Sequence, residues 1–322
     1  MAVLWLIAGL VVLWKGADLL VAGAVVLARQ LGVSSLVVGL TVVAMGTSAP
    51  ELAASIAGVL RKAGGGDLAV GNVFGSNIAN LALVGGLVAL IRPLEVKRKT
   101  LFREIPVMLA VALLLWPFLY NSYLARPEGL ILLVVFTIFI LITVHTAKRE
   151  GRQSLNEVRN SSHEIKKEAP HTVKNVLFVI IGLIGLALGA KVAVYDGAVV
   201  IGTRVGLSED VIALTIIAFG TSLPELVTCV VAAVKGHHDI SVGNLVGSNI
   251  FNTLLVTGAA GVVKPFQMES QRLAGGTDYW IMIAVSVLFT AFVIIGRRVI
   301  GRMCGIVLVC VYVGYIVYLL LV

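Results

Sequence analysis

The chain has 322 residues, of which 59% are hydrophobic and only 13% are charged, and it contains 34 glycines. Ordinary soluble domains are about 25% charged, so this composition, with a mean hydropathy of +1.02, excludes a water-soluble enzyme. The formal net charge is +8. In a membrane protein, basic residues usually record topology, so this charge does not predict a nucleic-acid partner.

Apolar runs between polar breaks predict ten membrane-spanning helices, since each span needs about 20 apolar residues. The expected spans are residues 2–28, 34–60, 68–91, 104–120, 124–146, 175–203, 207–234, 240–263, 278–296 and 300–321. The first run lacks a basic leader and continues to Leu27, so we expect a span and not a cleaved signal peptide. The predicted fold class is an all-α integral membrane protein, multi-pass in the cell membrane and in contact with lipid.

The ten predicted spans form two sets of five, in residues 1–147 and 175–322. A polar connection, residues 148–174, separates the two sets and is too short to hold a regulatory domain. Lys and Arg number 17 in the odd-numbered connections and 6 in the even-numbered ones. The positive-inside rule therefore predicts that the odd connections, including 148–174, are cytoplasmic and that both termini are extracytoplasmic.

The second half of the chain repeats the first. Residues 32–52, GVSSLVVGLTVVAMGTSAPEL, align without gaps on residues 206–226, GLSEDVIALTIIAFGTSLPEL, with 12 of 21 positions identical. A second pair of motifs, GNVFGSNIAN at 71–80 and GNLVGSNIFN at 243–252, shares 7 of 10 positions. Because five is an odd number, the two sets must enter the membrane from opposite sides. Inverted repeats of this kind are typical of secondary transporters.

A glutamate follows a proline in each GTS-x-P-E motif, at Glu51 and Glu225. A charge deep in a span costs roughly 2.5 to 3.5 kcal/mol on insertion scales, and the proline frees carbonyls of the preceding turn. Asn80 and Asn252 add amide oxygens. Such hard oxygen donors suit Ca²⁺, Na⁺ or Mg²⁺ and disfavour zinc or copper. A kinked helix with a paired glutamate would explain one motif, but duplication at matched positions favours a functional site.

The paired motifs GTSAPEL with GNVFGSNIAN and GTSLPEL with GNLVGSNIFN resemble the two alpha-repeats of the cation/calcium exchanger superfamily, most closely its prokaryotic sodium/calcium exchanger branch. The resemblance covers essentially the whole chain. It implies a sodium/calcium antiporter, not an enzyme, with four central cation sites, no cofactor, and spans 1 and 6 as sliding gate helices. By this similarity Ca²⁺ would bind Glu51, Glu225 and the main-chain oxygens of Thr47 and Thr221. The sodium sites would include Ser48, Ser76, Ser222, Ser248 and the carbonyls of Ala44 and Ala218, with Asn80 and Asn252 at the middle of the cluster.

Some relatives, including the potassium-dependent branch, carry aspartate where this chain has Asn252, so the resemblance favours potassium-independent exchange. A site with two carboxylates is neutral with Ca²⁺ and carries +1 with three Na⁺, which predicts electrogenic 3:1 exchange. Two alternatives stay open: a proton/calcium antiporter, in which the glutamates titrate, and a cation channel. Serine and threonine around the glutamates favour sodium, and inverted repeats with broken helices favour a transporter.

Four further groups of residues are expected to be structural. Lys15 and Asp18 are three residues apart on the first span and are expected to pair or to line a vestibule, and Lys191 and Asp196 are expected at an interface. The His-His-Asp run at 237–239 is expected in a wet turn, since adjacent side chains cannot converge on one metal ion. The three cysteines stand in apolar runs and are expected to be small buried residues without disulfides.

Overall fold

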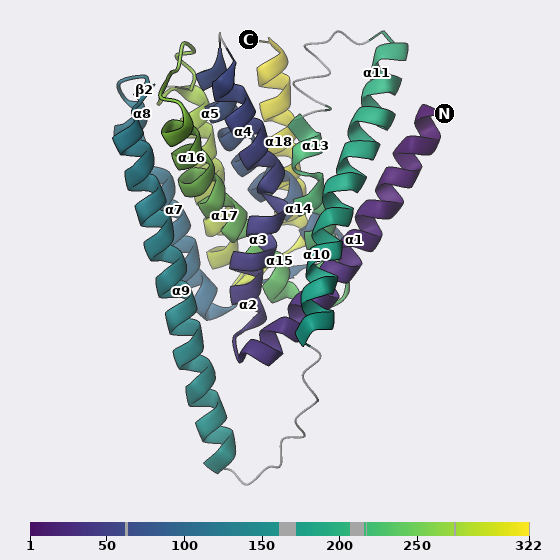
Figure 1. Cartoon of the computed structure of the whole chain (residues 1–322), viewed down its shortest axis with the longest axis vertical. Helices are drawn as coiled ribbons and strands as arrows, with labels where there is room; N and C mark the ends of the chain where they lie inside the picture. The colour runs from purple at the N-terminus through teal and green to yellow at the C-terminus, as the bar shows by residue number, and fades with distance from the viewer. Residues whose placement is uncertain (62–63, 161–171, 207–215, 217, 274, 322) are drawn as a thin grey trace.

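The computed structural model describes residues 1–61, 64–160, 172–206, 216, 218–273 and 275–321, and most of these are helical (Figure 1). Eight described helices are long and apolar enough to cross a membrane: Ala2–Leu31, Gly65–Ile91, Thr100–Leu119, Arg126–Glu150, Val173–Arg204, His238–Val263, Thr277–Ile295 and Arg302–Leu321. A bent pair, Ser35–Thr47 with Ala49–Leu60, makes a ninth span when counted as one. The predicted span 207–234 lies partly outside the described residues, and its second half is an apolar helix.

Several of these spans are interrupted by short π-helical turns, in which the hydrogen-bonding register widens by one residue. In the first half the order is α1 (Ala2–Leu31), α2 (Ser35–Val38), η1 (Gly39–Val43), α3 (Ala44–Thr47), α4 (Ala49–Leu60), α5 (Gly65–Ile78), η2 (Ala79–Val84), α6 (Gly85–Ile91), β1 (Leu94–Glu95), η3 (Thr100–Glu104), α7 (Ile105–Leu114), α8 (Trp116–Leu119), β2 (Tyr123–Leu124) and α9 (Arg126–Asn160). In the second half it is α10 (Thr172–Lys191), η4 (Val192–Val199), α11 (Val200–Arg204), α13 (Ala218–Thr221), α14 (Leu223–Val234), α15 (His238–Phe251), η6 (Asn252–Val256), α16 (Thr257–Val263), β3 (Phe266–Gln267), α17 (Thr277–Ile295), β4 (Val299–Ile300) and α18 (Arg302–Leu321).

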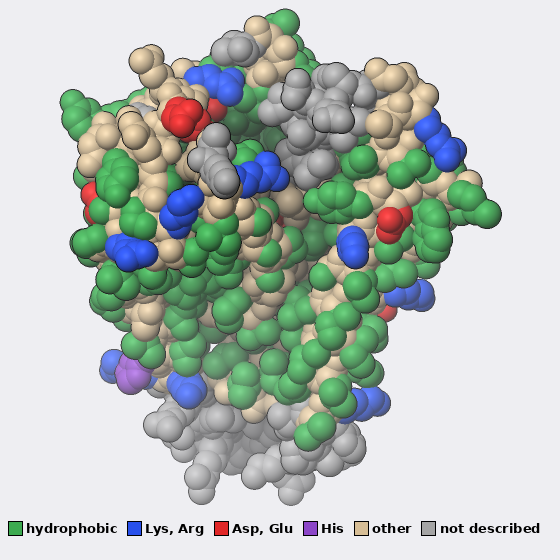
Figure 2. Space-filling model, turned by 45° about the horizontal axis from the view of Figure 1, so that its top comes forward, with side chains coloured by type: hydrophobic (Ala, Val, Ile, Leu, Met, Phe, Trp, Pro, Cys, Tyr) green, Lys and Arg blue, Asp and Glu red, His purple; other side chains and the backbone are tan. Residues whose placement is uncertain are grey.

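The surface of the bundle suits a lipid environment. Large apolar side chains are exposed along the outer helices, including Leu141 and Ile142 on α9 and Val313 on α18. Figure 2 shows hydrophobic side chains covering much of the visible flank. Lipid can solvate such side chains, whereas an apolar surface of this extent would aggregate in water. The prediction of a multi-pass membrane protein is therefore confirmed.

Two antiparallel ribbons connect the first half of the chain to the second. β1 pairs with β4, and β2 pairs with β3. Aspartates related by 172 residues add matched contacts: Asp67 accepts hydrogen bonds from the main-chain N–H groups of Glu269 and Ser270 at 3.0 and 3.1 Å, and Asp239 pairs with Lys97. The two halves are thus joined at several points, which ties spans from both into one body.

Cationic side chains cap the far ends of α4 and α14. Arg92, just after α6, donates to the carbonyls of Ala233 and Val234 at 3.2 and 2.9 Å, at the end of α14. Lys264, just after α16, donates to the Arg61 carbonyl at 3.1 Å, at the end of α4. The last carbonyls of a helix have no partner within it, so each cation satisfies groups that would otherwise stay unpaired. The two caps stand 172 residues apart in the sequence and each comes from the other half of the chain.

α1 and α10 pack against each other as a tilted pair beside the rest of the bundle (Figure 1). Gly9, Gly16 and Gly23 recur every seven residues on α1 and meet α10 and η4. A Cβ atom added at Gly16 would lie 2.8 Å from the main-chain nitrogen of Leu186 and 2.9 Å from the carbonyl oxygen of Gly182. The two backbones are therefore in direct contact, as small residues allow in membrane helices. Buried side chains of the pair form much of a second apolar cluster beside the main core.

Some expectations for individual residues and boundaries are corrected. α9 continues through Asn160, so residues 148–160 of the predicted polar connection are helical. Asp18 pairs with Lys235, at the end of α14, and not with Lys15. The cysteines are free, as expected, but Cys310 is exposed, because its position on α18 faces outward. The His-His-Asp run begins α15 at His238 and is only partly a turn. Both ends of the chain lie at the same end of the bundle (Figure 1).

Candidate ion-binding site

Both GTS-x-P-E motifs break a helix at their serine. α3 and α4 meet at Ser48 with φ −84° and ψ 6°, and α13 and α14 meet at Ser222 with φ −88° and ψ 2°. The helical segment Ser35–Thr47, which ends with α3, and α4 are bent by 42° relative to each other. Pro50 and Pro224 each stand in the first turn of the second helix, where the absent N–H is tolerated. The repeated sequence thus produces the same local backbone twice.

The freed carbonyls are fewer than expected. Proline at position 50 removes the helical donor for the carbonyl of Gly46, four residues earlier. The Ala44 carbonyl, however, accepts the Ser48 N–H at 3.0 Å and lies 3.4 Å from the Thr47 hydroxyl, so donors are within reach of both its lone pairs. Ala218 begins α13, and its side chain lies outside the described part of the structure.

Glu51 and Glu225 are the third residues of α4 and α14, and both are completely buried. Neither carboxylate oxygen of Glu51 has a hydrogen-bond partner among the described residues, and the same holds for Oε2 of Glu225. Oε1 of Glu225 accepts the Ser48 hydroxyl at 3.0 Å, which links the two motifs directly. Buried anions with open acceptors strongly favour binding of a cation.

Asn80 and Asn252 lie opposite these glutamates in the packing. α4, which carries Glu51, packs against η6, and α14, which carries Glu225, packs against η2. Asn252 begins η6 and Asn80 is the second residue of η2. Both amides are fully buried, and none of their side-chain N and O atoms has a partner in the described structure. π-Helical turns occur frequently at functional sites, where they redirect a side chain. Each glutamate helix therefore contacts the asparagine turn of the other half.

Hydroxyl groups surround the glutamates. The Thr47 hydroxyl donates to Oδ1 of Asn244 at 3.0 Å, and the Ser248 hydroxyl donates to the same oxygen at 3.4 Å. The buried residues of the predicted set are Ala44, Thr47, Ser48, Glu51, Ser76, Asn80, Ser222, Glu225, Ser248 and Asn252. Thr221 is half-buried. The cluster is rich in oxygen, and the described residues contain no group of three His, Cys, Asp or Glu side chains that could hold a metal.

Sequence reasoning missed four polar residues next to this cluster. Asn72 and Asn244 follow the first glycine of each GN-x-x-GSN motif, and they hydrogen-bond to Ser55 and Cys229, one turn after each glutamate. The matched positions of the two asparagines were a signal that could have indicated their role. The glycines of this motif pack closely only in the second half: a Cβ at Gly243 would lie 2.7 Å from the Leu36 carbonyl oxygen, whereas a Cβ at Gly75 would have nothing within 4 Å.

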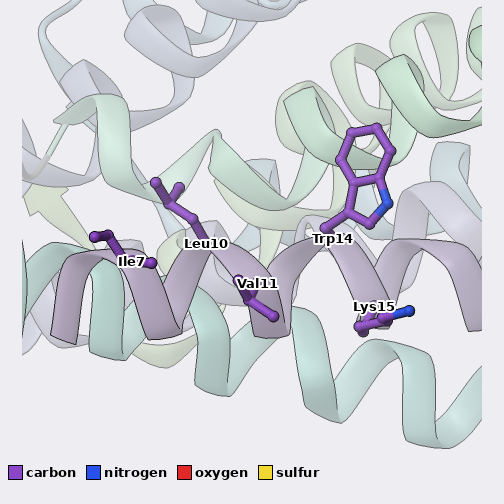
Figure 3. A pocket seen from close by; sticks show the side chains of 5 residues that line it. All are labelled: Ile7, Leu10, Val11, Trp14 and Lys15. Carbon is purple, nitrogen blue, oxygen red and sulfur yellow. The ribbon is translucent and has the colours of Figure 1, made fainter. Parts of the chain in front are cut away.

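A shallow hollow of about 260 Å³ lies elsewhere, on the outer face of α1 (Figure 3). Ile7, Leu10, Val11, Trp14 and Lys15 line it, and none of the predicted site residues does. None of the lining side chains carries an oxygen, so the hollow offers no side-chain oxygen ligand for a cation.

Comparison with known proteins agrees with this geometry. The model of the sodium/calcium exchanger protein family matches residues 1–145 and 174–321. The chain belongs to the sodium/calcium exchanger family. A putative antiporter, CaxA of Alkalimonas amylolytica, is 38% identical over 98% of this chain and 97% of its own, and the sodium/calcium exchanger MaX1 of Methanosarcina acetivorans is 34% identical over 98% and 97%.

The fold of this exchanger-family chain is also found in solved structures. The sodium-calcium exchanger NCX_Mj, in crystals soaked with zero Na⁺ and Ca²⁺, superimposes with a TM-score of 0.81 at 30% identity, covering 99% of this chain and all of the other. The resemblance stated from the paired motifs, to the prokaryotic branch of the superfamily, is thereby confirmed.

Proposed function

We propose that this family member is a secondary antiporter that exchanges Na⁺ for Ca²⁺ across the cell membrane. The observation that carries the proposal is the pair of fully buried glutamates, Glu51 and Glu225, which are supplied by two identically broken helices and have open acceptor oxygens. Two carboxylates neutralise one Ca²⁺, whose six to eight oxygen ligands tolerate flexible geometry. Family membership supports the same ions.

In this proposal Ca²⁺ binds the two carboxylates together with the main-chain oxygens of Thr47 and Thr221. Sodium ions occupy overlapping sites formed with Ser48, Ser76, Ser222, Ser248 and the carbonyls of Ala44 and Ala218, around Asn80 and Asn252. Overlap makes the two ion sets compete, so only one is carried in each half cycle. Asn252 supplies an amide instead of a carboxylate, so the site stays neutral with Ca²⁺ and carries +1 with three Na⁺. We expect potassium-independent and electrogenic exchange.

The proposed movement is alternating access in a protein of ten spans, arranged as two inverted sets of five, with both termini outside. The ribbons and the caps at Arg92 and Lys264 join the two halves into one core. α1 and α10 instead pack mainly on each other through glycines. We propose that this pair slides as a unit and exposes the buried cluster to each side in turn.

Isosteric removal of either charge tests the proposal. Glu51→Gln and Glu225→Gln each leave one carboxylate for a divalent ion, so sodium-driven calcium uptake into proteoliposomes should fall to background. Size-exclusion elution and thermal unfolding should stay close to those of the wild type, because glutamine removes a buried charge and not packing. Retained uptake in either variant would contradict the assignment. Calcium flux insensitive to an imposed membrane potential would contradict electrogenic exchange.

A further inference from the structure

The amide of Asn244 joins three helices around the glutamates. Its Oδ1 accepts hydrogen bonds from the hydroxyl of Thr47 on α3, at 3.0 Å, and from the hydroxyl of Ser248, one turn later on α15, at 3.4 Å. Its Nδ2 donates to the thiol of Cys229 on α14 at 3.3 Å. Asn244 is fully buried, so these contacts replace water and fix the orientation of the amide.

The first half of the chain contains a matching arrangement. Asn72 donates to the Ser55 hydroxyl at 2.9 Å, and that hydroxyl donates to the Ala69 carbonyl at 3.2 Å. In the second half the Cys229 thiol takes the place of the Ser55 hydroxyl and donates to the Ser241 carbonyl at 3.5 Å. Asn72 and Asn244, and likewise Ala69 and Ser241, stand 172 residues apart. The amide is thus tethered to the neighbouring helix in both repeats, by oxygen in one and by sulfur in the other.

The neighbouring Ser48 hydroxyl donates instead to Oε1 of Glu225 at 3.0 Å, and the Thr47 hydroxyl also lies 3.4 Å from the Ala44 carbonyl oxygen. A hydroxyl has one hydrogen and two acceptor lone pairs. When its hydrogen points to a carboxylate, that carboxylate oxygen is engaged and has less to offer a cation. When the hydrogen points to Asn244, the hydroxyl lone pairs and the carboxylate oxygen are both available. The neutral amide oxygen is therefore an alternative acceptor that leaves the negative oxygens for the ion.

We propose that Asn244 is a positioning residue of the cation site, which takes the hydroxyl hydrogens of Thr47 and Ser248 so that their oxygens face the transported ions. The proposal rests on the function proposed above and deepens it. Asn244 itself does not contact the ion. Because the Ser248 hydroxyl belongs to the proposed sodium sites, whereas Thr47 gives the calcium site only its main-chain oxygen, the orientation acts mainly on sodium. Cys229 holds the amide in place through its thiol.

The test compares three variants of the full-length protein in proteoliposomes, with ⁴⁵Ca²⁺ uptake measured as internal Na⁺ or external Ca²⁺ is varied. Asn244→Leu removes both the acceptor and the donor at similar volume. Cys229→Val removes only the tether, and Cys229→Ser reproduces the Asn72–Ser55 pair of the first repeat. Elution on size exclusion reports folding for each variant.

We expect Asn244→Leu to raise the half-saturating Na⁺ concentration about tenfold, because one well-oriented hydrogen-bonded ligand is lost. The half-saturating Ca²⁺ concentration should change by less than about threefold. Cys229→Val should raise the Na⁺ value by about threefold for a weaker sulfur contact, and Cys229→Ser should restore it. If Asn244→Leu does not fold, the two Cys229 variants decide the matter.

The proposal would be overturned if the half-saturating Na⁺ and Ca²⁺ concentrations stayed at wild-type values in both Asn244→Leu and Cys229→Val. Equal changes in the two constants, or a lower maximal rate alone, would show a merely structural role and would also overturn it. Absence of sodium-driven uptake in the wild type would refute the proposed exchange itself. Wild-type exchange with unaltered variants would refute only the role of Asn244.

Discussion

An ion pair joins α1, one helix of the proposed sliding pair α1 and α10, to the rest of the bundle. Its removal should shift the balance between the inward-open and outward-open conformations. Asp18 on α1 pairs with Lys235 at the end of α14. Their side chains are 40% and 39% exposed, so solvent screens the pair and its coupling is about 0.2 to 1 kcal/mol. At about 1.4 kcal/mol per tenfold change, this corresponds to a population shift of roughly 1.4- to fivefold. The pair can form only in conformations that bring α1 to this end of α14.

Electron spin resonance can measure this shift directly. Labels at Leu31, at the end of α1, and at Val234, at the end of α14, occupy two exposed positions. They report the distance between α1 and α14 after Cys304 and Cys310 are replaced by alanine. Asp18→Asn or Lys235→Gln should each populate a longer distance by the factor above, and the swapped pair Asp18→Lys with Lys235→Asp should return the distribution toward that of the wild type. The reasoning would be refuted if the distance distribution were unchanged in both single variants. It would also be refuted if the swapped pair shifted the distribution by the sum of the two single-variant shifts.

Three further outcomes follow from the packing. Gly16→Val should lower stability in thermal unfolding by about 1 to 3 kcal/mol, because the added Cβ meets the backbone of Leu186 and Gly182. The control Gly314→Ala on α18, whose Cβ would have nothing within 4 Å, should have little effect. Equal effects of the two substitutions would contradict close contact between α1 and α10. Arg92→Gln should destabilise the protein by about 1 kcal/mol and Lys264→Gln by less, because Arg92 donates two hydrogen bonds to helix-end carbonyls and Lys264 donates one. The reverse order of destabilisation would contradict this capping role. Burial, and then the charges of Lys235, Arg29 and His238, lowers the pKa of His237, so the folded state binds this proton less readily than the unfolded state. Stability should therefore fall as pH drops below about 6.5, and His237→Gln should reduce that slope.

Much of the fold was predictable because apolar length and repetition are directly visible in the sequence. The two serine breaks follow from Pro50 and Pro224, whose missing N–H groups start a new helix at matched positions. The end of α9 was not predictable from hydropathy. Residues 148–160 are polar, yet they continue a helix begun in the membrane, since polar residues without proline or glycine caps do not end a helix.

The glutamates and asparagines of the predicted site were identified by type and repetition, and the remaining site residues by the family resemblance. The contacts of all of them depend on tertiary packing. The bond from Ser48 to Glu225 joins residues 177 positions apart, and no local pattern indicates such a pair. The same applies to Asp18, whose partner Lys235 comes from another span, although Lys15 was closer in sequence. The π-helical turns at Asn80 and Asn252 contact helices of the other half of the chain, and no sequence propensity distinguishes such turns from ordinary helix.

The central claim is that sodium drives calcium transport through the buried glutamates. The most direct test is ⁴⁵Ca²⁺ uptake into proteoliposomes preloaded with Na⁺, with K⁺ or with an outward proton gradient, while the membrane potential is held near zero. We expect uptake only with internal Na⁺, and none with Glu51→Gln or Glu225→Gln. Uptake driven by protons alone would keep the buried calcium site but contradict sodium coupling, and a current too fast for a carrier would show a channel instead.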